Sequence, residues 1–193
     1  MGEVTVQQQP NIKIHMIIPP NSPRWSTESR PIEGLSQREI ETPEGLGYDL
    51  RVSEIFELNG RGHLGVTLRN TPDTISLGRL SSDGEKSISL ESGKCYLVQT
   101  LETVSFSALV GGLIFPRSTL FRSGVLLQSS VVPSGYVGPL TFGLAVLSSA
   151  GFEIELGARF AHLVVVEVGD GATMYEGQWN GGRVSAITPE VQK

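Results

Sequence analysis

Residues 116–124 contain the closely spaced polar side chains of this chain that are best suited to binding or catalysis. The segment reads PRSTLFRSG, and it places two guanidinium groups and three hydroxyl groups within nine residues, between two apolar runs. Arginine binds phosphate oxygens through a bidentate fork, and hydroxyl or backbone N–H groups satisfy the remaining acceptors. We therefore predict a phosphate site at Arg117, Ser118, Thr119 and Arg122. Taken alone, the segment is equally compatible with a solvated helical turn, because short motifs are weak in isolation.

Other residue types that commonly carry chemistry are few and scattered. The three histidines, His15, His63 and His162, lie far apart and lack the spacing of metal ligands, so no catalytic metal held directly by the protein is predicted. Cys95 is the only cysteine, which excludes a disulfide within this chain and a cysteine-based zinc site. Its apolar neighbours predict a buried thiol. The lack of a disulfide framework favours the reducing cytoplasm.

The charge balance limits the partners that the chain can take. Lys and Arg number 15 against 20 Asp and Glu, a formal net charge of −5. Proteins that bind nucleic acid usually carry a basic surface that neutralises phosphates, so no nucleic-acid partner is expected. No stretch approaches the roughly 18 apolar residues that a membrane span requires. The first residues also lack the basic start and apolar run of a signal peptide. We therefore expect an unprocessed cytoplasmic protein with no membrane partner.

Short apolar-alternating runs separated by turn residues flank the phosphate-site segment and must position it. The chain has 193 residues with 23 Gly and 11 Pro, enough for one domain rich in turns. We predict a mostly β fold, a single-domain β-barrel or jelly roll with few short helices. One helical turn is expected at residues 35–40, capped by Ser36. Residues 1–44 are predicted to form an irregular N-terminal arm, 45–168 the β domain and 169–193 a C-terminal arm.

Several segments resemble one known family. Residues 90–127 are similar to the dCTP deaminase pattern of a turn, an alternating strand, Thr-Leu-Glu and then Arg-Ser-Ser-Leu-x-Arg-x-Gly. Residues 47–51 (GYDLR), 135–138 (GYVG) and 156–163 (LGARFAHL) resemble further motifs, the last of which deaminases share with dUTPases. Residues 175–181 (YEGQWNG) resemble the C-terminal arm of the deaminases. By this resemblance the chain is identified as a member of the dCTP deaminase and dUTPase superfamily, closer to the deaminase branch.

The resemblance implies a β-clip fold of the dUTPase type, assembled as a homotrimer with its three active sites between subunits. Each site would hold a deoxynucleoside triphosphate, dCTP, dUTP or dTTP, with Mg²⁺ bound mainly through the phosphates. The segment with Arg117, Ser118 and Arg122 would contact the triphosphate or order the attacking water. Tyr175 and Gln178 would close the C-terminal arm over the nucleotide. Trp179 would stack on the base or, equally, anchor the arm on a neighbouring subunit.

Two positions depart from the family. Deaminases supply their proton-transferring glutamate from the strand after the Gly-aromatic-x-Gly turn, and that position falls on Gly143. The aspartate with which dUTPases activate water falls on Pro133, three residues before Tyr136. Both usual catalytic carboxylates are therefore absent. The nearest alternatives in sequence are Asp49, Glu102, Glu153 and Glu155, of which the last two alternate on an expected strand and suit a solvated face.

Three functions remain open on these residues. The first is a dCTP deaminase-like hydrolase of dUTP biosynthesis that converts dCTP to dUTP and ammonia with a relocated base. The second is a catalytically degenerate nucleotide-binding trimer, a sensor or regulator, favoured by Gly143 and Pro133. The third is a dUTP diphosphatase. A purely structural β trimer is a weaker reading, because the guanidinium and hydroxyl groups suited to phosphate are retained.

Overall fold

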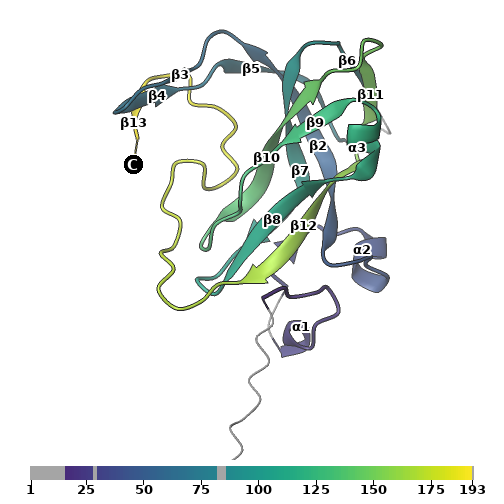
Figure 1. The fold of residues 1–193 in the computed structure, drawn as a ribbon, viewed down its shortest axis with the longest axis vertical. Coiled ribbons are helices and arrows are strands. Elements are labelled where there is room, and N and C mark those ends of the chain that lie inside the picture. Colours follow the sequence, from purple (N-terminus) through teal and green to yellow (C-terminus); the bar gives the residue numbers. More distant parts are fainter. Residues whose placement is uncertain (1–15, 28–29, 82–85, 193) are drawn as a thin grey trace, which may run out of the picture.

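The computed structural model describes residues 16–27, 30–81 and 86–192, and it is mostly β, as the sequence predicts (Figure 1). Three short helices accompany the strands of the described residues: α1 (Arg24–Thr27), α2 (Gln37–Glu41) and α3 (Ser118–Arg122). The strands are β1 (Ile32–Glu33), β2 (Tyr48–Asn59), β3 (His63–Leu64), β4 (Leu68–Asn70), β5 (Asp73–Arg79), β6 (Ser87–Leu90), β7 (Cys95–Ser105), β8 (Val110–Pro116), β9 (Val125–Gln128), β10 (Val137–Val146), β11 (Phe152–Glu155), β12 (Arg159–Glu167) and β13 (Glu190–Val191).

One sheet, in the order β8-β12-β2-β7-β10-β9, carries the core. Its two ends approach each other, because Gly112 of β8 and Val132, which follows β9, exchange backbone hydrogen bonds of 2.8 Å. The sheet therefore curves into a nearly closed barrel around one apolar core. Side chains alternate between core and outer face along each strand, as in β7, where Tyr96, Val98 and Val104 are buried.

The same alternation corrects the prediction of a buried thiol. Cys95 is exposed at the first residue of β7, whereas the next residue, Tyr96, is 2% exposed. Because successive side chains in a strand point to opposite faces, Tyr96 takes the core position and Cys95 the outer one. Glu153 and Glu155 of β11 are exposed, as the strand pattern predicts.

The N-terminal arm is fixed to the barrel by hydrogen bonds. Helix α2 begins at the predicted cap, where Ser36 Oγ accepts the backbone N–H of Glu39 at 3.3 Å. Strand β1 pairs antiparallel with β7. No helix in residues 16–27, 30–81 and 86–192 has the length and apolar character to span a bilayer.

The C-terminal arm runs along the outer face of the barrel and ends on a small separate sheet (Figure 1). The backbone N–H of Gly181 donates to the carbonyl of Val137 at 2.7 Å, and Asn180 Oδ1 accepts the N–H of Val137 at 2.8 Å. Farther along, β13 pairs with β4. The arm is therefore docked on its own chain over much of its length.

A buried ion pair joins the centre of the sheet. Glu102 of β7 is fully buried; its Oε2 accepts the backbone N–H of Arg51 at 2.8 Å and its Oε1 accepts Arg51 Nε at 2.7 Å. Burial raises the pKa of Glu102, although the hydrogen bonds and charge of Arg51 oppose this. The pair connects β2 and β7 at the level where the N-terminal arm attaches, since Arg51 also donates to the carbonyl of Gly34.

Replacing Glu102 with Ala should lower the free energy of unfolding by about 3–5 kcal/mol, because the guanidinium and N–H of Arg51 lose their partner inside the protein. Urea unfolding measures the loss. The matched control is Glu155→Gln, which changes an exposed carboxylate and should alter stability by less than about 0.5 kcal/mol. Equal stability of the two variants would contradict a structural role for the buried pair.

Candidate functional site

Asp49 is the centre of a polar cluster at one end of the barrel. It lies opposite His162 in the antiparallel register of β2 and β12, which places the two side chains on the same face. His162 Nδ1 lies 2.8 Å from Asp49 Oδ1. Only 3% of the Asp49 side chain is exposed, against 24% for His162. The pair is therefore buried at its carboxylate end and open at its imidazole end.

Two arginines neutralise the other oxygen of this carboxylate. Arg117 pairs with Asp49 Oδ2, and Arg159 Nη1 lies 3.0 Å from the same atom. Arg117 is held at this point because its backbone N–H donates to the carbonyl of Phe160 at 3.0 Å and because its own carbonyl accepts the N–H of Leu120 at 3.0 Å at the start of α3. The pairing of β8 with β12 therefore places Arg117, the first of the predicted phosphate-binding residues, beside Asp49.

The N-terminal arm completes the cluster. Glu39 of α2 is 1% exposed and its Oε2 accepts the backbone N–H of Asp49 at 2.9 Å. Arg38 pairs with Glu39 and, at 2.7 Å, with Glu44. Three arginines and three carboxylates therefore surround one point, and their charges balance formally.

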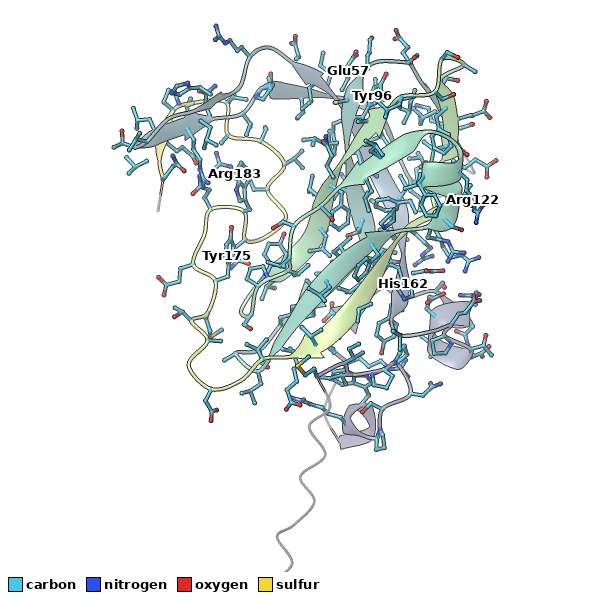
Figure 2. All side chains as sticks on the ribbon, viewed as in Figure 1. Glu57, Tyr96, Arg122, His162, Tyr175 and Arg183 are labelled. Atoms are coloured by element: carbon cyan, nitrogen blue, oxygen red, sulfur yellow. The ribbon has the colours of Figure 1, made fainter. Side chains whose placement is uncertain are left out.

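A cavity of about 370 Å³ opens beside this cluster; Figure 2 labels His162 on its lining. The lining residues are Leu46, Asp49, Phe115, Pro116, Arg117, Ser118, His162 and Val164. The pKa of Arg117 is lowered by burial and by the charges of Arg159 and Arg38, so a further anion at the cavity would relieve the repulsion among these cations. Arg117 has five N–H donors and Asp49 does not use all of them. The cavity is therefore suited to a phosphate group.

The other two residues of the predicted phosphate segment do not line this cavity in the structure as described. Thr119 is exposed on α3. Arg122, at the far end of α3, is exposed with its guanidinium carbon 5.7 Å from the ring centroid of Phe121. Arg117 precedes α3 and Arg122 is its last residue, and only Arg117 lines the first cavity.

A second cavity, of about 720 Å³, lies between the outer face of the sheet and the C-terminal arm. Tyr136, Tyr175 and Trp179 bring aromatic rings to it, and the Tyr136 and Tyr175 centroids are 5.8 Å apart. Gln178 Nε2 donates to Glu190 Oε2 at 3.1 Å, within the arm itself. The lining residues are Leu58, Thr71, Pro72, Leu97, Ser130, Val131, Val132, Pro133, Tyr136, Leu140, Thr141, Phe142, Tyr175, Trp179, Arg183 and Val184.

Two guanidinium groups lie close to the indole ring of Trp179. The guanidinium carbons of Arg69 and Arg183 are 5.3 and 5.9 Å from the centroid of its indole ring. The backbone N–H of Trp179 donates to Tyr175 Oη at 3.3 Å. In this chain the indole is thus held by contacts of its own subunit, and it also borders the second cavity.

Gly143 and Pro133 are the positions to which the resemblance assigns the catalytic carboxylates of the family. Gly143 pairs with Gln128 across β10 and β9, and a Cβ atom at position 143 would lie 2.5 Å from Gln128 Oε1. The amide of Gln128 therefore fills the space of a side chain at position 143. Pro133 begins the turn at 133–136, in which the N–H of Tyr136 donates to the Pro133 carbonyl at 3.3 Å and Gly135 has a φ of 80°. Such a φ favours glycine.

The structure brings the predicted residues together in two groups rather than one. Arg117 and Ser118 line the first cavity, whereas Tyr175 and Trp179 line the second. Figure 2 shows Arg122 and His162 on the opposite side of the molecule from Tyr175 and Arg183. A single chain thus has two separate cavities, each lined by some of the predicted residues.

Sequence reasoning named Asp49 only as a possible carboxylate and did not identify its partners Arg159, His162 and Glu39. The partners lie 110, 113 and 10 positions away in sequence. The GYDLR and LGARFAHL motifs were the available signal, since both supply residues to the cluster. Only the register between β2 and β12 shows that they meet.

The side chains around the first cavity are poorly suited to bind a metal ion directly. Among the described residues, no group of three or more His, Cys, Asp or Glu side chains is arranged to hold one. Both oxygens of Asp49 already accept from Arg117, Arg159 or His162. Mg²⁺ commonly binds through substrate phosphates and retains several waters, and such a mode requires no protein cage.

Comparison with known proteins finds similarity to dCTP deaminases and to dUTP nucleotidohydrolases. The dCTP deaminase-like family matches residues 27–168. A deoxyuridine 5'-triphosphate nucleotidohydrolase of Methanocaldococcus jannaschii is 30% identical over 158 residues, 81% of this chain and 96% of that protein. A dCTP deaminase of Aeropyrum pernix is 35% identical over 94 residues, 47% of this chain and 51% of that protein. The crystal structure of 2'-deoxycytidine 5'-triphosphate deaminase from Agrobacterium tumefaciens has a similar fold, with a TM-score of 0.60 and 16% identity over 79% of this chain and 48% of that one.

The imidazole of His162 should make the stability of the protein depend on pH. Its pKa is lowered, mainly by burial, with Arg117 contributing in the same direction and Glu39 and Glu44 opposing. The unfolded chain, with an ordinary histidine pKa of about 6.5, then binds more protons than the folded protein. The stability contribution is complete above that value and decreases as the pH falls through it.

Urea midpoints compared between about pH 7.5 and about pH 5 should therefore fall more for the natural protein than for His162→Gln. The control is His63→Gln, which removes an exposed histidine on β3 and should retain the dependence of the natural protein. Parallel losses in the natural protein and in His162→Gln would show that His162 does not contribute to the pH effect.

Proposed function

Because the chain belongs to the dCTP deaminase-like family, we propose that it binds a pyrimidine deoxynucleoside triphosphate and does not deaminate it. The observation that carries this proposal is the lining of the second cavity, which in this chain contains aromatic and hydroxyl groups and one arginine but no carboxylate or imidazole. A cavity of this composition can hold a base, and its lining lacks the carboxylate or imidazole that most often transfers protons in such a reaction.

The phosphate end of the proposed site is the first cavity. Arg117 presents N–H donors beside Ser118, and the neighbouring cations favour an additional anion. Thr119 and Arg122 follow on α3 and would contact a phosphate farther from Asp49. Mg²⁺ would accompany the nucleotide, bound through phosphate oxygens and water, and would neutralise part of their charge.

The base end is the second cavity. Tyr136, Tyr175 and Trp179 offer aromatic faces, and Arg183 and Gln178 belong to the same arm. Since the two cavities lie on opposite sides of one chain, a complete site requires the phosphate end of one subunit and the base end of another (Figure 2). A homotrimer supplies three such shared sites by symmetry.

A deaminase with a relocated base is less well supported. Gln128 fills the space beside Gly143, and an amide cannot act as a general base at neutral pH. Glu102 is a buried carboxylate on the neighbouring strand β7, but both of its oxygens accept hydrogen bonds from Arg51. A nucleotide-binding trimer without deaminase activity, acting as a sensor or regulator, accounts for these features together.

Titration with dCTP, dUTP or dTTP in the presence of Mg²⁺ should raise the thermal unfolding midpoint, because a ligand that binds only the folded state stabilises it. Incubation with dCTP should release no ammonia above the rate without protein. Release of ammonia would overturn the non-deaminating assignment, and a midpoint unmoved by all three nucleotides would overturn nucleotide binding.

Arg117→Lys should weaken nucleotide binding by about 10- to 100-fold, because Lys keeps the charge but cannot form a bidentate fork on phosphate. Isothermal titration calorimetry measures the change. The matched control is Arg79→Lys on β5, whose side chain is 70% exposed and pairs with Glu54. Equal affinities of the two variants would exclude Arg117 from the site.

Sharing of the site between subunits has a distinctive consequence. Arg117→Lys and Trp179→Ala should each bind poorly alone, the second because base stacking is worth about 1–3 kcal/mol. Co-expression of the two variants should recover about a quarter of the sites, those formed by an intact phosphate end and an intact base end from different subunits. Stoichiometry from calorimetry measures the recovery, and none at all would place both ends in one subunit.

A further inference from the structure

Helix α2 contributes a buried carboxylate to the cluster that contains Arg117, and the proposed binding function does not use it. Glu39 is 1% exposed, and its Oε2 accepts the backbone N–H of Asp49 at 2.9 Å. Its Oε1 pairs with Arg38 and lies 3.9 Å from Arg159 Nη1. A charge held in this way acts on an anion at the first cavity, because charges interact more strongly where water is largely excluded.

The electrostatic effect of this segment extends to Arg117. Burial and two neighbouring arginines lower the pKa of Arg117, whereas Glu44 and Glu39 raise it. These two carboxylates therefore stabilise the guanidinium when no ligand is present. A phosphate bound at Arg117 would be repelled by the same two charges, so part of its attraction to the arginines would be cancelled.

The balance of formal charge shows how much one carboxylate matters. The cluster contains three arginines and three carboxylates, so it has no surplus of positive charge. Removing the charge of Glu39 would leave a surplus of one positive charge near Arg117. Such a surplus raises the local concentration of anions and their affinity. The buried charge of Glu39 therefore opposes the binding of a phosphate group.

We propose that Glu39 is an internal counter-ion that lowers the affinity of the first cavity for phosphate, so that docking of α2 and binding of a nucleotide oppose each other. This inference rests on the proposed nucleotide binding at Arg117 and concerns its regulation. Glu39 acts through its charge and through Asp49, which it positions. Helix α2 is thus an autoinhibitory contact on the phosphate end of the site.

The opposition is reciprocal. If docked α2 weakens nucleotide binding by a given factor, a bound nucleotide weakens the docking of α2 by the same factor. Release of α2 from Asp49 would therefore raise the affinity for nucleotide, and saturation with nucleotide would loosen α2. A lid that closes over its ligand behaves in the opposite way, because binding protects it from hydrogen exchange.

The first experiment measures nucleotide affinity in Glu39→Gln, which keeps the size of the side chain and an oxygen that can accept the N–H of Asp49. Isothermal titration calorimetry with dUTP, dCTP and dTTP, with Mg²⁺ and at low salt, should show binding about 3- to 30-fold tighter than in the natural protein. The matched control is Glu41→Gln on the same helix, an exposed carboxylate that accepts from Gln37. Its affinity should equal that of the natural protein.

The direction of the change separates regulation from a structural role. Loss of a purely structural contact would weaken binding, because Asp49 and its partners would be less well positioned. Unchanged or weaker binding by a folded Glu39→Gln variant would therefore overturn the proposal.

A second variant keeps the proposal testable if Glu39→Gln does not fold. The Glu44 side chain is 74% exposed and pairs with Arg38 at 2.7 Å, so Glu44→Gln should cost little stability. Its nucleotide affinity should rise by about 1.5- to 5-fold at low salt, and the gain should shrink as added salt screens the exposed charge. In that case, absence of a gain in Glu44→Gln would overturn the proposal.

The imidazole of His162 reports the charge of Glu39 without any ligand. Burial lowers the pKa of His162, and Glu39 and Glu44 oppose this effect. In Glu39→Gln the pKa measured by NMR titration should therefore fall further. Loosening of α2 would instead admit water and raise the pKa toward about 6.5. A rise would contradict an electrostatic role for Glu39.

Hydrogen exchange in the natural protein tests the reciprocal effect. In α2 and at its end, the backbone N–H of Ile40 donates to the carbonyl of Ser36 at 3.1 Å and that of Thr42 to the carbonyl of Arg38 at 2.8 Å. Saturation with nucleotide should accelerate the exchange of these two amides, while the amides of the barrel strands exchange more slowly because the ligand stabilises the fold. Slower exchange in α2 would overturn the opposition.

The outcomes distinguish this inference from the function on which it rests. If no nucleotide binds to the natural protein or to any variant, the proposed nucleotide binding itself fails. If the natural protein binds a nucleotide and the folded Glu39→Gln variant binds it no more tightly, only the role of Glu39 fails. Binding that is detected in Glu39→Gln and not in the natural protein would support both.

Discussion

Asp49 carries a charge at a position where only 3% of its side chain meets solvent, and the site end of the barrel is arranged around that charge. Moving a carboxylate out of water costs several kcal/mol, so it is tolerable only with complete pairing. Arg117, before α3, and Arg159 and His162, both on β12, supply the partners from two separate segments. Each partner is thereby fixed in position and orientation before any ligand arrives, which lowers the entropic cost of binding.

The N-terminal arm depends on the same carboxylate. Glu39 reaches the backbone N–H of Asp49, and Arg38 bridges Glu39 and Glu44. Helix α2 is therefore part of the wall of the cluster. The contacts of α2 also complete the charge balance of the cluster, because its three arginines are then matched by three carboxylates. A phosphate group would be held by spare N–H donors of Arg117 without requiring a net positive pocket.

The proposed phosphate end and base end of the nucleotide site lie in two different cavities. The first combines charged and apolar residues that strand register brings together, whereas the second is mostly apolar, includes four aromatic residues and is bordered by the C-terminal arm. In one chain the arm lies on its own sheet through Gly181 and β13. If a nucleotide binds between subunits, these contacts would remain. The hydrogen bonds that dock the arm would then also fix the position of the side chains at the proposed base end.

The sequence by itself determined the mostly β fold, the family, the Ser36 cap and the solvated face of β11, because these follow from side-chain alternation and local hydrogen bonding. Its assignment of Arg117 and Ser118 to a phosphate site stays a prediction, and both residues line the first cavity. It misjudged Cys95, whose apolar neighbours do not specify which face a strand residue takes. Only the tertiary structure joined Asp49 to His162 and Arg159, more than 100 residues away, and placed Arg117 but not Arg122 on the lining of the first cavity. Strand register and the direction of a helical turn decide these contacts, and neither can be read from local spacing.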